Sequence, residues 1–340
     1  MPITWRPATL KDIESGLSIQ PRYLGDAIVG RKAAAAIWKR LGRHRFFISC
    51  VMESSLLPPG DRIVCFGASV IVTDSFADAE LANPHPDINS RLVASLHGGK
   101  PVLATSDEVA RSNAGAGVNV FIVYSAWRED ILNPEDLQSV LAFSPASFTE
   151  LHAGYRIRQI FQEPAGKPEL DLVRRSIEFR AVAEFPEDGR VLFRMNRESV
   201  QGIPGSLANA IFSRREPCLH LRDSDQQLLL AGLKGLTDSE LADELEISFS
   251  AVKARWRSTF ARIADSMPSL VTDTSDREGR GLQKRHRVLS YVRNHMEELR
   301  PYDWQLDSNS STSPRRPKKS PGDQSTSQLR SESEGITVAR

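Results

Sequence analysis

The sequence predicts an N-terminal domain of the α+β or α/β class, followed by an all-α domain and a disordered C-terminal tail. Over the first 200 residues, apolar strand-like segments alternate with helix-like segments, which is typical of a sheet covered by helices. Residues 218–304 carry helical patterns only, and residues 305–340 are rich in Ser, Pro and charge. The predicted divisions are therefore 1–200, a linker at 201–217 that is marked by Pro and Gly, 218–304 and 305–340.

Length, charge and cysteine content restrict the class of protein. A chain of 340 residues predicts two domains, and 44 Lys and Arg against 43 Asp and Glu exclude a uniformly basic protein. No apolar run is long enough to span a bilayer, and the first residues do not form a secretory signal, so we expect a cytoplasmic protein without membrane contact. The three cysteines (Cys50, Cys65 and Cys218) are far apart and predict neither a disulfide nor a metal site.

Each element of the N-terminal domain is predicted from its apolar pattern and its bounding turn residues. The expected helices are 12–18, 30–41, 134–142 and 147–152. The expected strands are 46–52, 62–72, 118–124, 155–161 and 190–195. A short helix is also expected within the linker at 206–212.

Two segments of this domain resemble the GNAT family of acyltransferases: ITWRPATLKDIE at 3–14 and GYRIRQIFQE at 154–163. The resemblance implies a GNAT-like fold. Catalysis in that family needs a glycine-rich cradle that follows a strand and opens a helix, so that free amides hold the phosphates of coenzyme A. The nearest candidate is 111–117 (RSNAGAG), whose glycines come one residue late and precede a strand. We therefore assign no catalytic and no cofactor-binding residue, and we expect no cofactor.

The helical region divides into three helices and a further helical segment. Asp223 can cap the first helix, which ends at Gly235. Thr237 and Glu240 form a capping box that opens the second helix. The third helix has an apolar stripe, which consists of Val252, Trp256, Phe260 and Ile263.

This region resembles the LuxR/GerE-type helix-turn-helix family. The match runs through GLTDSELA at 235–242, LEIS at 245–248, VK at 252–253 and FARI at 260–263. The resemblance implies that the third helix enters a groove of DNA. The expected DNA contacts are the small and basic residues Ser250, Lys253, Ala254, Arg255, Arg257, Ser258 and Arg262.

The predicted function is sequence-specific DNA binding by a transcriptional regulator. The resemblance implies a homodimer on DNA, with an N-terminal domain that senses a small-molecule effector or mediates assembly. The alternative is an acyl-CoA-dependent N-acyltransferase with an accessory helical domain, so the question of enzymatic activity stays open, with the regulator favoured. A further helix at 277–300 could brace a dimer, extend the phosphate-contacting surface or pack on the N-terminal domain.

Overall fold

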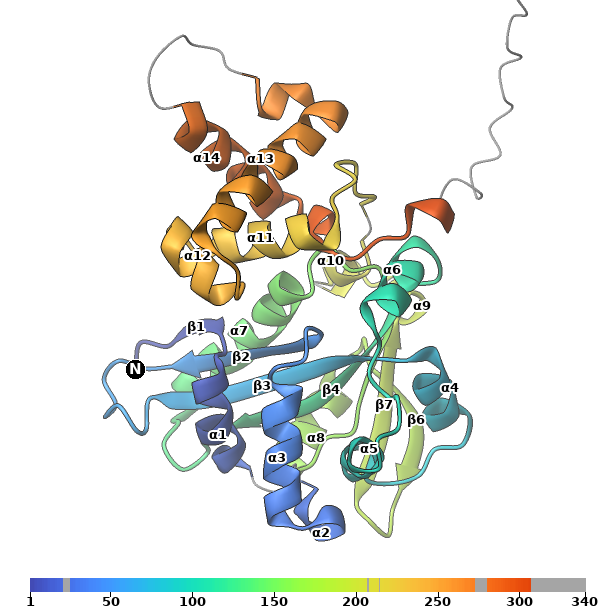
Figure 1. The fold of residues 1–340 in the computed structure, drawn as a ribbon. Helices are drawn as coiled ribbons and strands as arrows, with labels where there is room; N and C mark the ends of the chain where they lie inside the picture. Colours follow the sequence, from blue (N-terminus) through green and yellow to red (C-terminus); the bar gives the residue numbers. More distant parts are fainter. Residues whose placement is uncertain (21–24, 207, 214, 273–279, 307–340) are drawn as a thin grey trace, which may run out of the picture.

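The structure is a computed structural model that describes residues 1–20, 25–206, 208–213, 215–272 and 280–306. A mixed sheet forms the centre of the N-terminal part, helices cover both of its faces, and a group of helices lies above it (Figure 1). The strands are β1 (Thr4–Pro7), β2 (Phe47–Glu53), β3 (Ile63–Val72), β4 (Val118–Trp127), β5 (Ile157–Gln162), β6 (Arg180–Phe185) and β7 (Arg190–Asn196).

The sheet has the order β1-β2-β3-β4-β5-β7-β6. All neighbouring strands are antiparallel except β4 and β5, which are parallel. A parallel pair needs a crossover, and α7 supplies it. The predicted mixed α/β domain is confirmed.

Helices of the N-terminal part lie on the two faces of the sheet (Figure 1). One face is covered by α1, α3 and α5, whose apolar residues form the main core with β3 and β4. The other face carries α7, α8 and α10. The helices are α1 (Leu10–Ile19), α2 (Asp26–Val29), α3 (Arg31–Leu41), α4 (Asp74–Ala82), α5 (Ile88–His97), α6 (Ser106–Ala114), α7 (Pro134–Leu151), α8 (Lys167–Arg175), α9 (Arg197–Val200) and α10 (Ala208–Ile211).

Aromatic side chains fill the core on the α1 face. Trp38 of α3 is 2% exposed, and its ring meets the rings of Tyr124 and Phe47 edge-on at 6.2 and 6.4 Å. The Tyr124 hydroxyl donates to the Gly16 carbonyl at the end of α1. These contacts fix α1 and α3 against the sheet, because a buried phenol must satisfy its hydroxyl.

The expected helices 134–142 and 147–152 are one continuous helix, α7, in which Pro145 is an interior residue. The missing amide of Pro145 costs one hydrogen bond of this helix. Packing of α7 on the sheet maintains the helix through the break, and such tertiary contacts cannot be read from the local pattern. The elements α2, α4, α5, α6, α8, α9 and β6 were not predicted from the sequence.

The helical region consists of α11 (Asp223–Leu233), α12 (Asp238–Glu244), α13 (Phe249–Ser266) and α14 (Arg280–Asn294), with 3-10 turns η2 (Pro268–Leu270) and η3 (Met296–Leu299). Its core contains the predicted stripe, in which Val252, Trp256 and Ile263 are buried. Val288 and Val292 of α14 lie in this same core, so α14 packs within the helical region, which is none of the three roles considered for residues 277–300.

Most of the predicted tail lies outside the described residues, which end at Leu306. The two tail residues that are described, Gln305 and Leu306, belong to a short helical turn. Within the described ranges, no helix has the length and apolar character that a membrane span requires.

Candidate active site

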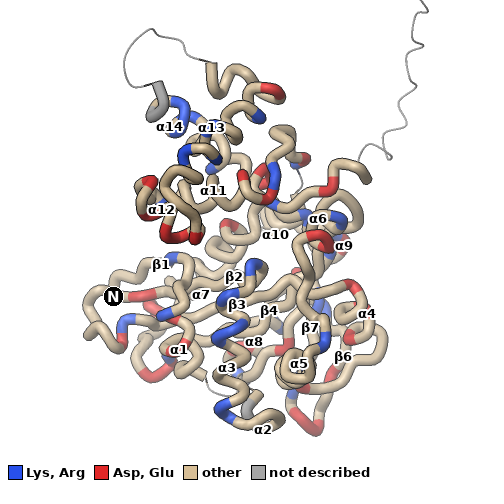
Figure 2. The backbone as a smooth tube through the Cα atoms, viewed as in Figure 1, with Lys and Arg blue, Asp and Glu red and all other residues tan. Residues whose placement is uncertain are grey.

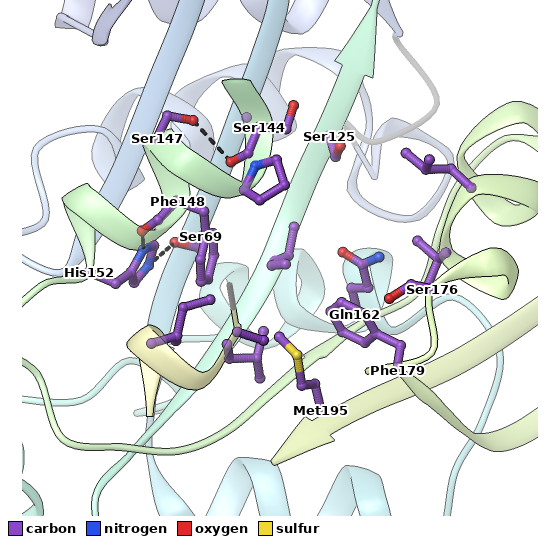
Figure 3. A pocket seen from close by; sticks show the side chains of 18 of the residues that line it. Ser69, Ser125, Ser144, Ser147, Phe148, His152, Gln162, Ser176, Phe179 and Met195 are labelled. Carbon is purple, nitrogen blue, oxygen red and sulfur yellow. Dashed lines mark hydrogen bonds between the residues drawn. The ribbon is translucent and has the colours of Figure 1, made fainter. Parts of the chain in front are cut away.

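A cavity of about 660 Å³ lies on the second face of the sheet, between α7, α8 and α10 (Figure 3). The sheet supplies its floor through β2, β3, β4, β5 and β7. Cavities of this size with apolar walls and a few polar groups are typical of small-molecule sites. The apolar walls are formed by Ile48, Met52, Ile122, Leu141, Phe148, Leu151, Ile160, Leu172, Phe179, Met195 and Ile211.

A β-bulge in β4 determines which side chains face this cavity. Val123 is left out of the pairing between β3 and β4. Because of this extra residue, the side chains of both Val123 and Tyr124 pack in the core on the α1 face. Ile122 and Ser125 line the cavity together with part of Tyr124, so the bulge places the Ser125 hydroxyl on the cavity floor.

The cavity lies where the parallel pairing ends. Ile122 of β4 and Gln162 of β5 are the last paired residues, and β4 continues to Trp127 beside β3 alone. Both Ile122 and Gln162 line the cavity. Ligands of sheets with parallel strands bind near the carboxyl ends of those strands, and this cavity has that position.

Ser69 of β3 and His152, directly after α7, form a hydrogen-bonded pair in the cavity wall (Figure 3). The Nε2 atom of His152 lies 2.8 Å from the Ser69 hydroxyl oxygen, and Nδ1 lies 2.8 Å from the Phe148 carbonyl oxygen. A carbonyl oxygen only accepts, so Nδ1 carries the ring proton and Nε2 accepts the Ser69 hydroxyl. Burial lowers the pKa of His152 to about 4, so the ring is neutral at pH 7.

A neutral imidazole that accepts from a hydroxyl can take up a proton from a nucleophile, either directly or through that hydroxyl. Ser69 is 2% exposed and His152 is 4% exposed. Bulk water therefore has little access to the pair, and a proton exchanged there would come from a molecule inside the cavity. This arrangement is suited to acyl-group chemistry on an apolar substrate.

The position of His152 depends on the helical region. Arg300, directly after η3, donates from Nε to the Ala153 carbonyl at 2.9 Å and from Nη2 to the Leu151 carbonyl at 3.1 Å. These carbonyls belong to the end of α7, where unpaired carbonyl groups need donors. The positive charge of Arg300 also contributes, after burial, to the low pKa of His152.

A second group of polar residues lies on the α8 side of the cavity, across β4 from His152 (Figure 3). Gln162 and Ser176 project there, and the carboxylate of Glu169 accepts the Ala165 amide at 3.1 Å. Glu178 accepts hydrogen bonds from Ser176 and from Ser206 of the segment before α10. The two bonds to Glu178 tie the segment before α10 to the end of α8 and close this side of the cavity.

Two thiols complete the lining. Burial raises the pKa of both Cys50 and Cys65. Both thiols are therefore protonated at pH 7 and act as small apolar groups rather than nucleophiles.

Coenzyme A, which the acyltransferase resemblance implies, does not fit the residues present. Residues 111–117 form the end of α6 and the turn into β4, and the positive φ of Gly117 serves that turn, where a Cβ would lie 2.8 Å from the Arg156 carbonyl oxygen. The connection that follows β4 and opens α7 holds Glu129 and Asp130 and contains no glycine. The first segment forms the turn into β4 and the second is acidic and lacks glycine, so neither has the form of a diphosphate cradle.

The residues predicted to contact DNA all lie on α13, whose Lys and Arg residues are visible above the acidic α12 (Figure 2). Arg262 is bound inside the helical region, where its Nε donates to the buried carboxylate of Asp225 at 2.9 Å. Arg255 is half-buried. The remaining predicted contacts are exposed, and they are Ser250, Lys253, Ala254, Arg257 and Ser258.

No protein-family model and no curated protein sequence matches the chain. Among solved structures, the C-terminal condensation domain of Ebony in complex with beta-alanyl-dopamine is 12% identical, with a TM-score of 0.36 over 58% of this chain and 99% of that chain. NAA60 of Arabidopsis thaliana in complex with acetyl-CoA is 15% identical, with a TM-score of 0.33 over 57% and 99%. FeeM, an N-acyl amino acid synthase from uncultured soil microbes, is 10% identical, with a TM-score of 0.33 over 57% and 90%.

The predicted function as a LuxR-type DNA-binding regulator is wrong. The matched structures are a condensation domain, a protein bound to acetyl-CoA and an N-acyl amino acid synthase. None of the three is described as a DNA-binding protein, and no comparison supports a LuxR-type helix-turn-helix domain. The capping box and the apolar stripe predicted the helices correctly, but helix packing alone does not specify DNA binding.

The sequence analysis missed Ser69 and His152. They are 83 residues apart in the chain, and only the packing of α7 on β3 brings them together. The available signals were a single serine in the apolar stretch 62–72 and a histidine just before the turn at Gly154. Neither signal identifies a site without its partner.

Proposed function

We propose that the N-terminal domain transfers an acyl group from an acyl thioester to an amine. The observation that carries this proposal is the apolar cavity at the end of the β4–β5 pairing, with a neutral histidine and a serine hydroxyl in its wall. The apolar walls suit the acyl chain, because burial of each methylene contributes about 0.8 kcal/mol. The polar pair suits the carbonyl end, where protons are exchanged.

The proposed reaction requires one proton transfer that the chain can assist. The amine nitrogen forms a bond to the thioester carbonyl carbon and becomes positively charged. His152 accepts the excess proton at Nε2, with the Ser69 hydroxyl as the relay. The carbon–sulfur bond then breaks, and the proton passes to the sulfur, so that an amide and a free thiol leave.

Exclusion of water protects the thioester in this scheme. The pair is almost fully buried, so an amine that enters with an apolar body competes with few water molecules for the carbonyl. The low pKa of His152 keeps Nε2 unprotonated throughout the neutral range. The base is therefore available at pH 7, although a base of low pKa removes protons less effectively than one near 7.

The test uses the full chain with an octanoyl thioester and a panel of primary amines, and it follows amide formation by mass spectrometry. We expect amide to form only with protein, thioester and amine together. Ser69→Ala and His152→Gln should each lower the rate by about 100-fold, which is the lower range for loss of acid–base assistance. Ser139→Ala is the control, because its hydroxyl donates to the Glu135 carbonyl of the same helix and does not line the cavity.

Circular dichroism before each assay separates loss of chemistry from loss of fold. If folded Ser69→Ala and His152→Gln proteins keep the wild-type rate, the pair has no part in the reaction. If no thioester and amine combination gives amide and no thioester binds, the proposed function is wrong.

A further inference from the structure

The two helix N-termini at the carboxyl ends of the parallel strands both carry carboxylates in their first turns, Glu135 and Asp136 in α7 and Glu169 in α8. In sheets with parallel strands, phosphates are received at such helix starts, where backbone amides and the helix dipole favour an anion. Here α7 follows β4 and α8 follows β5. These two connections are therefore the places where a nucleotide diphosphate would be received.

The connection from β4 to α7 is acidic and packed. Residues 128–136 contain one arginine and four carboxylates. The guanidinium of Arg128 is held by Asp130, with two hydrogen bonds of 2.8 Å. The Asn133 side chain accepts the Asp136 amide at 2.9 Å, and the apolar side chains of Ile131 and Leu132 pack into a cluster with Trp127.

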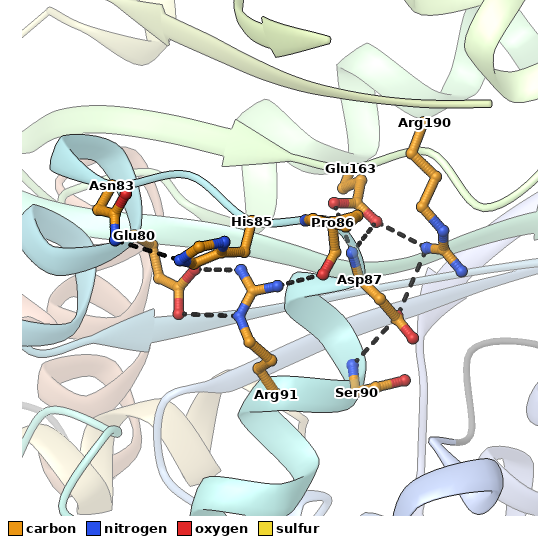
Figure 4. A network of polar contacts seen from close by, with 9 residues as sticks. All are labelled: Glu80, Asn83, His85, Pro86, Asp87, Ser90, Arg91, Glu163 and Arg190. Atoms are coloured by element: carbon orange, nitrogen blue, oxygen red, sulfur yellow. Dashed lines mark hydrogen bonds and ion pairs between the residues drawn. The ribbon is translucent and has the colours of Figure 1, made fainter. Parts of the chain in front are cut away.

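The segment from the end of β5 into α8 also carries two buried carboxylates, Glu163 and Glu169. Glu163, the first residue after β5, is 1% exposed and accepts the Asp87 amide at 3.0 Å and Arg190 Nη1 at 2.6 Å (Figure 4). Glu169 in the first turn of α8 accepts the Ala165 amide. A diphosphate placed at either helix start would meet these carboxylates at close range, which is unfavourable.

We propose that the acyl donor is recognised through its acyl chain and its thioester, and not through a nucleotide diphosphate. This inference rests on the proposed function and names the donor class: an acyl thioester whose thiol part needs no adenine nucleotide. The apolar cavity supplies the binding surface for the chain. The acidic connection 128–136 disfavours the nucleotide end of acyl-CoA.

The experiment compares octanoyl-CoA with octanoyl-pantetheine, which carries the same thioester arm without the nucleotide, on the full chain. We expect kcat/KM for amide formation with octanoyl-CoA to be several-fold lower than with octanoyl-pantetheine at low salt and to agree within about threefold at high salt, because the nucleotide gains no contact and meets the carboxylates of 128–136. Displacement of a fluorescent fatty acid from the protein should show the same pattern in binding. Free coenzyme A at about 1 mM should not displace the probe.

A charge variant tests whether the acidic connection 128–136 disfavours the nucleotide part of acyl-CoA. Glu129→Gln combined with Asp130→Asn should raise kcat/KM for octanoyl-CoA relative to octanoyl-pantetheine several-fold at low salt, and added salt should remove the gain. The control is Glu187→Gln combined with Asp188→Asn, which makes the same charge change at the exposed turn between β6 and β7 (Figure 1). An unchanged donor ratio in the first variant would overturn the assignment of this effect to residues 128–136.

The outcomes separate this inference from the function on which it rests. A preference for octanoyl-CoA of about tenfold or more, in rate or in displacement, would overturn the inference and leave acyl transfer intact. If neither thioester binds or reacts, both proposals are overturned. Displacement by both thioesters in the expected pattern, without amide formation, would support the donor recognition and contradict the transfer.

Discussion

The guanidinium of Arg300 lies 4.3 Å above the ring of Tyr155. Arg300 belongs to the segment that follows η3, whereas Tyr155 precedes β5 in the N-terminal domain. The contact thus joins two parts of the chain that were predicted as separate domains, next to the histidine that lines the cavity.

Replacement of this arginine should uncouple the two parts. Arg300→Ala removes two hydrogen bonds from a charged donor and one cation–π contact, which together contribute about 2–4 kcal/mol. In differential scanning calorimetry, we expect the wild-type chain to unfold in one transition and Arg300→Ala to unfold in two. Arg293→Ala, at an exposed position of α14, is the control. A single transition at an unchanged temperature in Arg300→Ala would show that the contact does not couple the two parts.

The buried state of His152 predicts a pH dependence of stability. The pKa of His152 is about 4 in the folded protein and 6.5 in the unfolded chain, so the unfolded chain binds more protons between these values. The part of the free energy of unfolding that comes from this pKa difference is complete above pH 6.5. It is lost as the pH falls towards 4, by about 3 kcal/mol in total. His152→Gln has no such titration. Urea unfolding of both proteins between pH 7 and 4 should show their free-energy difference changing with pH, and a constant difference would contradict the burial of a neutral ring.

Much of the sheet was predictable because its strands are apolar and bounded by turn residues. Residues 62–72 and 118–124 were predicted as strands and correspond to β3 and β4. The pairing order, the bulge at Val123 and the continuity of α7 through Pro145 depend on contacts between distant segments. Local patterns do not contain that information.

The candidate site was not predictable for the same reason. Its floor comes from five strands, and its walls come from α7, α8 and the linker helix α10. Ala208 and Ile211 of α10 line the cavity; the sequence predicted a short helix at 206–212 but not that it covers a cavity. The helical region was predicted well in structure, since its capping box and apolar stripe are local signals.

Narrowing the cavity should change chain-length selectivity. A Cβ at Gly67 of β3 would lie 3.4 Å from the Cys50 sulfur, its one close neighbour in the described part of the chain outside the adjoining residues, so the methyls of Gly67→Val would project into free space on the cavity floor. We expect kcat/KM for the longest accepted acyl chain to fall about 10-fold or more, with short chains little affected. The measurement is amide formation over a series of acyl lengths.

The control for this variant is Gly60→Val, since a Cβ at Gly60 meets no atom within 4 Å and the residue is exposed. An equal loss for all chain lengths in Gly67→Val would show that this part of the cavity does not hold the chain end.

The position of Trp256 in the core of the helical region predicts that its replacement lowers stability. This side chain is 6% exposed, packs beside Phe260 and lies 4.7 Å from the Arg285 guanidinium. Trp256→Ala should lower the free energy of unfolding by about 3–5 kcal/mol, because a large cavity remains. Lys253→Ala, on the exposed side of α13, should lower it by about 1 kcal/mol or less, because its ring contact is with the exposed Phe249. Chemical denaturation of the two variants measures both free energies of unfolding. Equal values would contradict the observed orientation of α13, in which Trp256 is buried and Lys253 is exposed.

The central claim is that the cavity between α7, α8 and α10 holds the acyl chain, and photo-crosslinking tests it most directly. The full chain is irradiated with an acyl thioester that carries a diazirine at the end of its chain, and the modified peptides are identified by mass spectrometry. The account predicts adducts within residues 141–152 and 205–211, in which Leu141, Phe148, Ala208 and Ile211 line the cavity, and their loss when excess unlabelled thioester is present. Adducts confined to residues 218–304, or adducts that unlabelled thioester does not reduce, would contradict it.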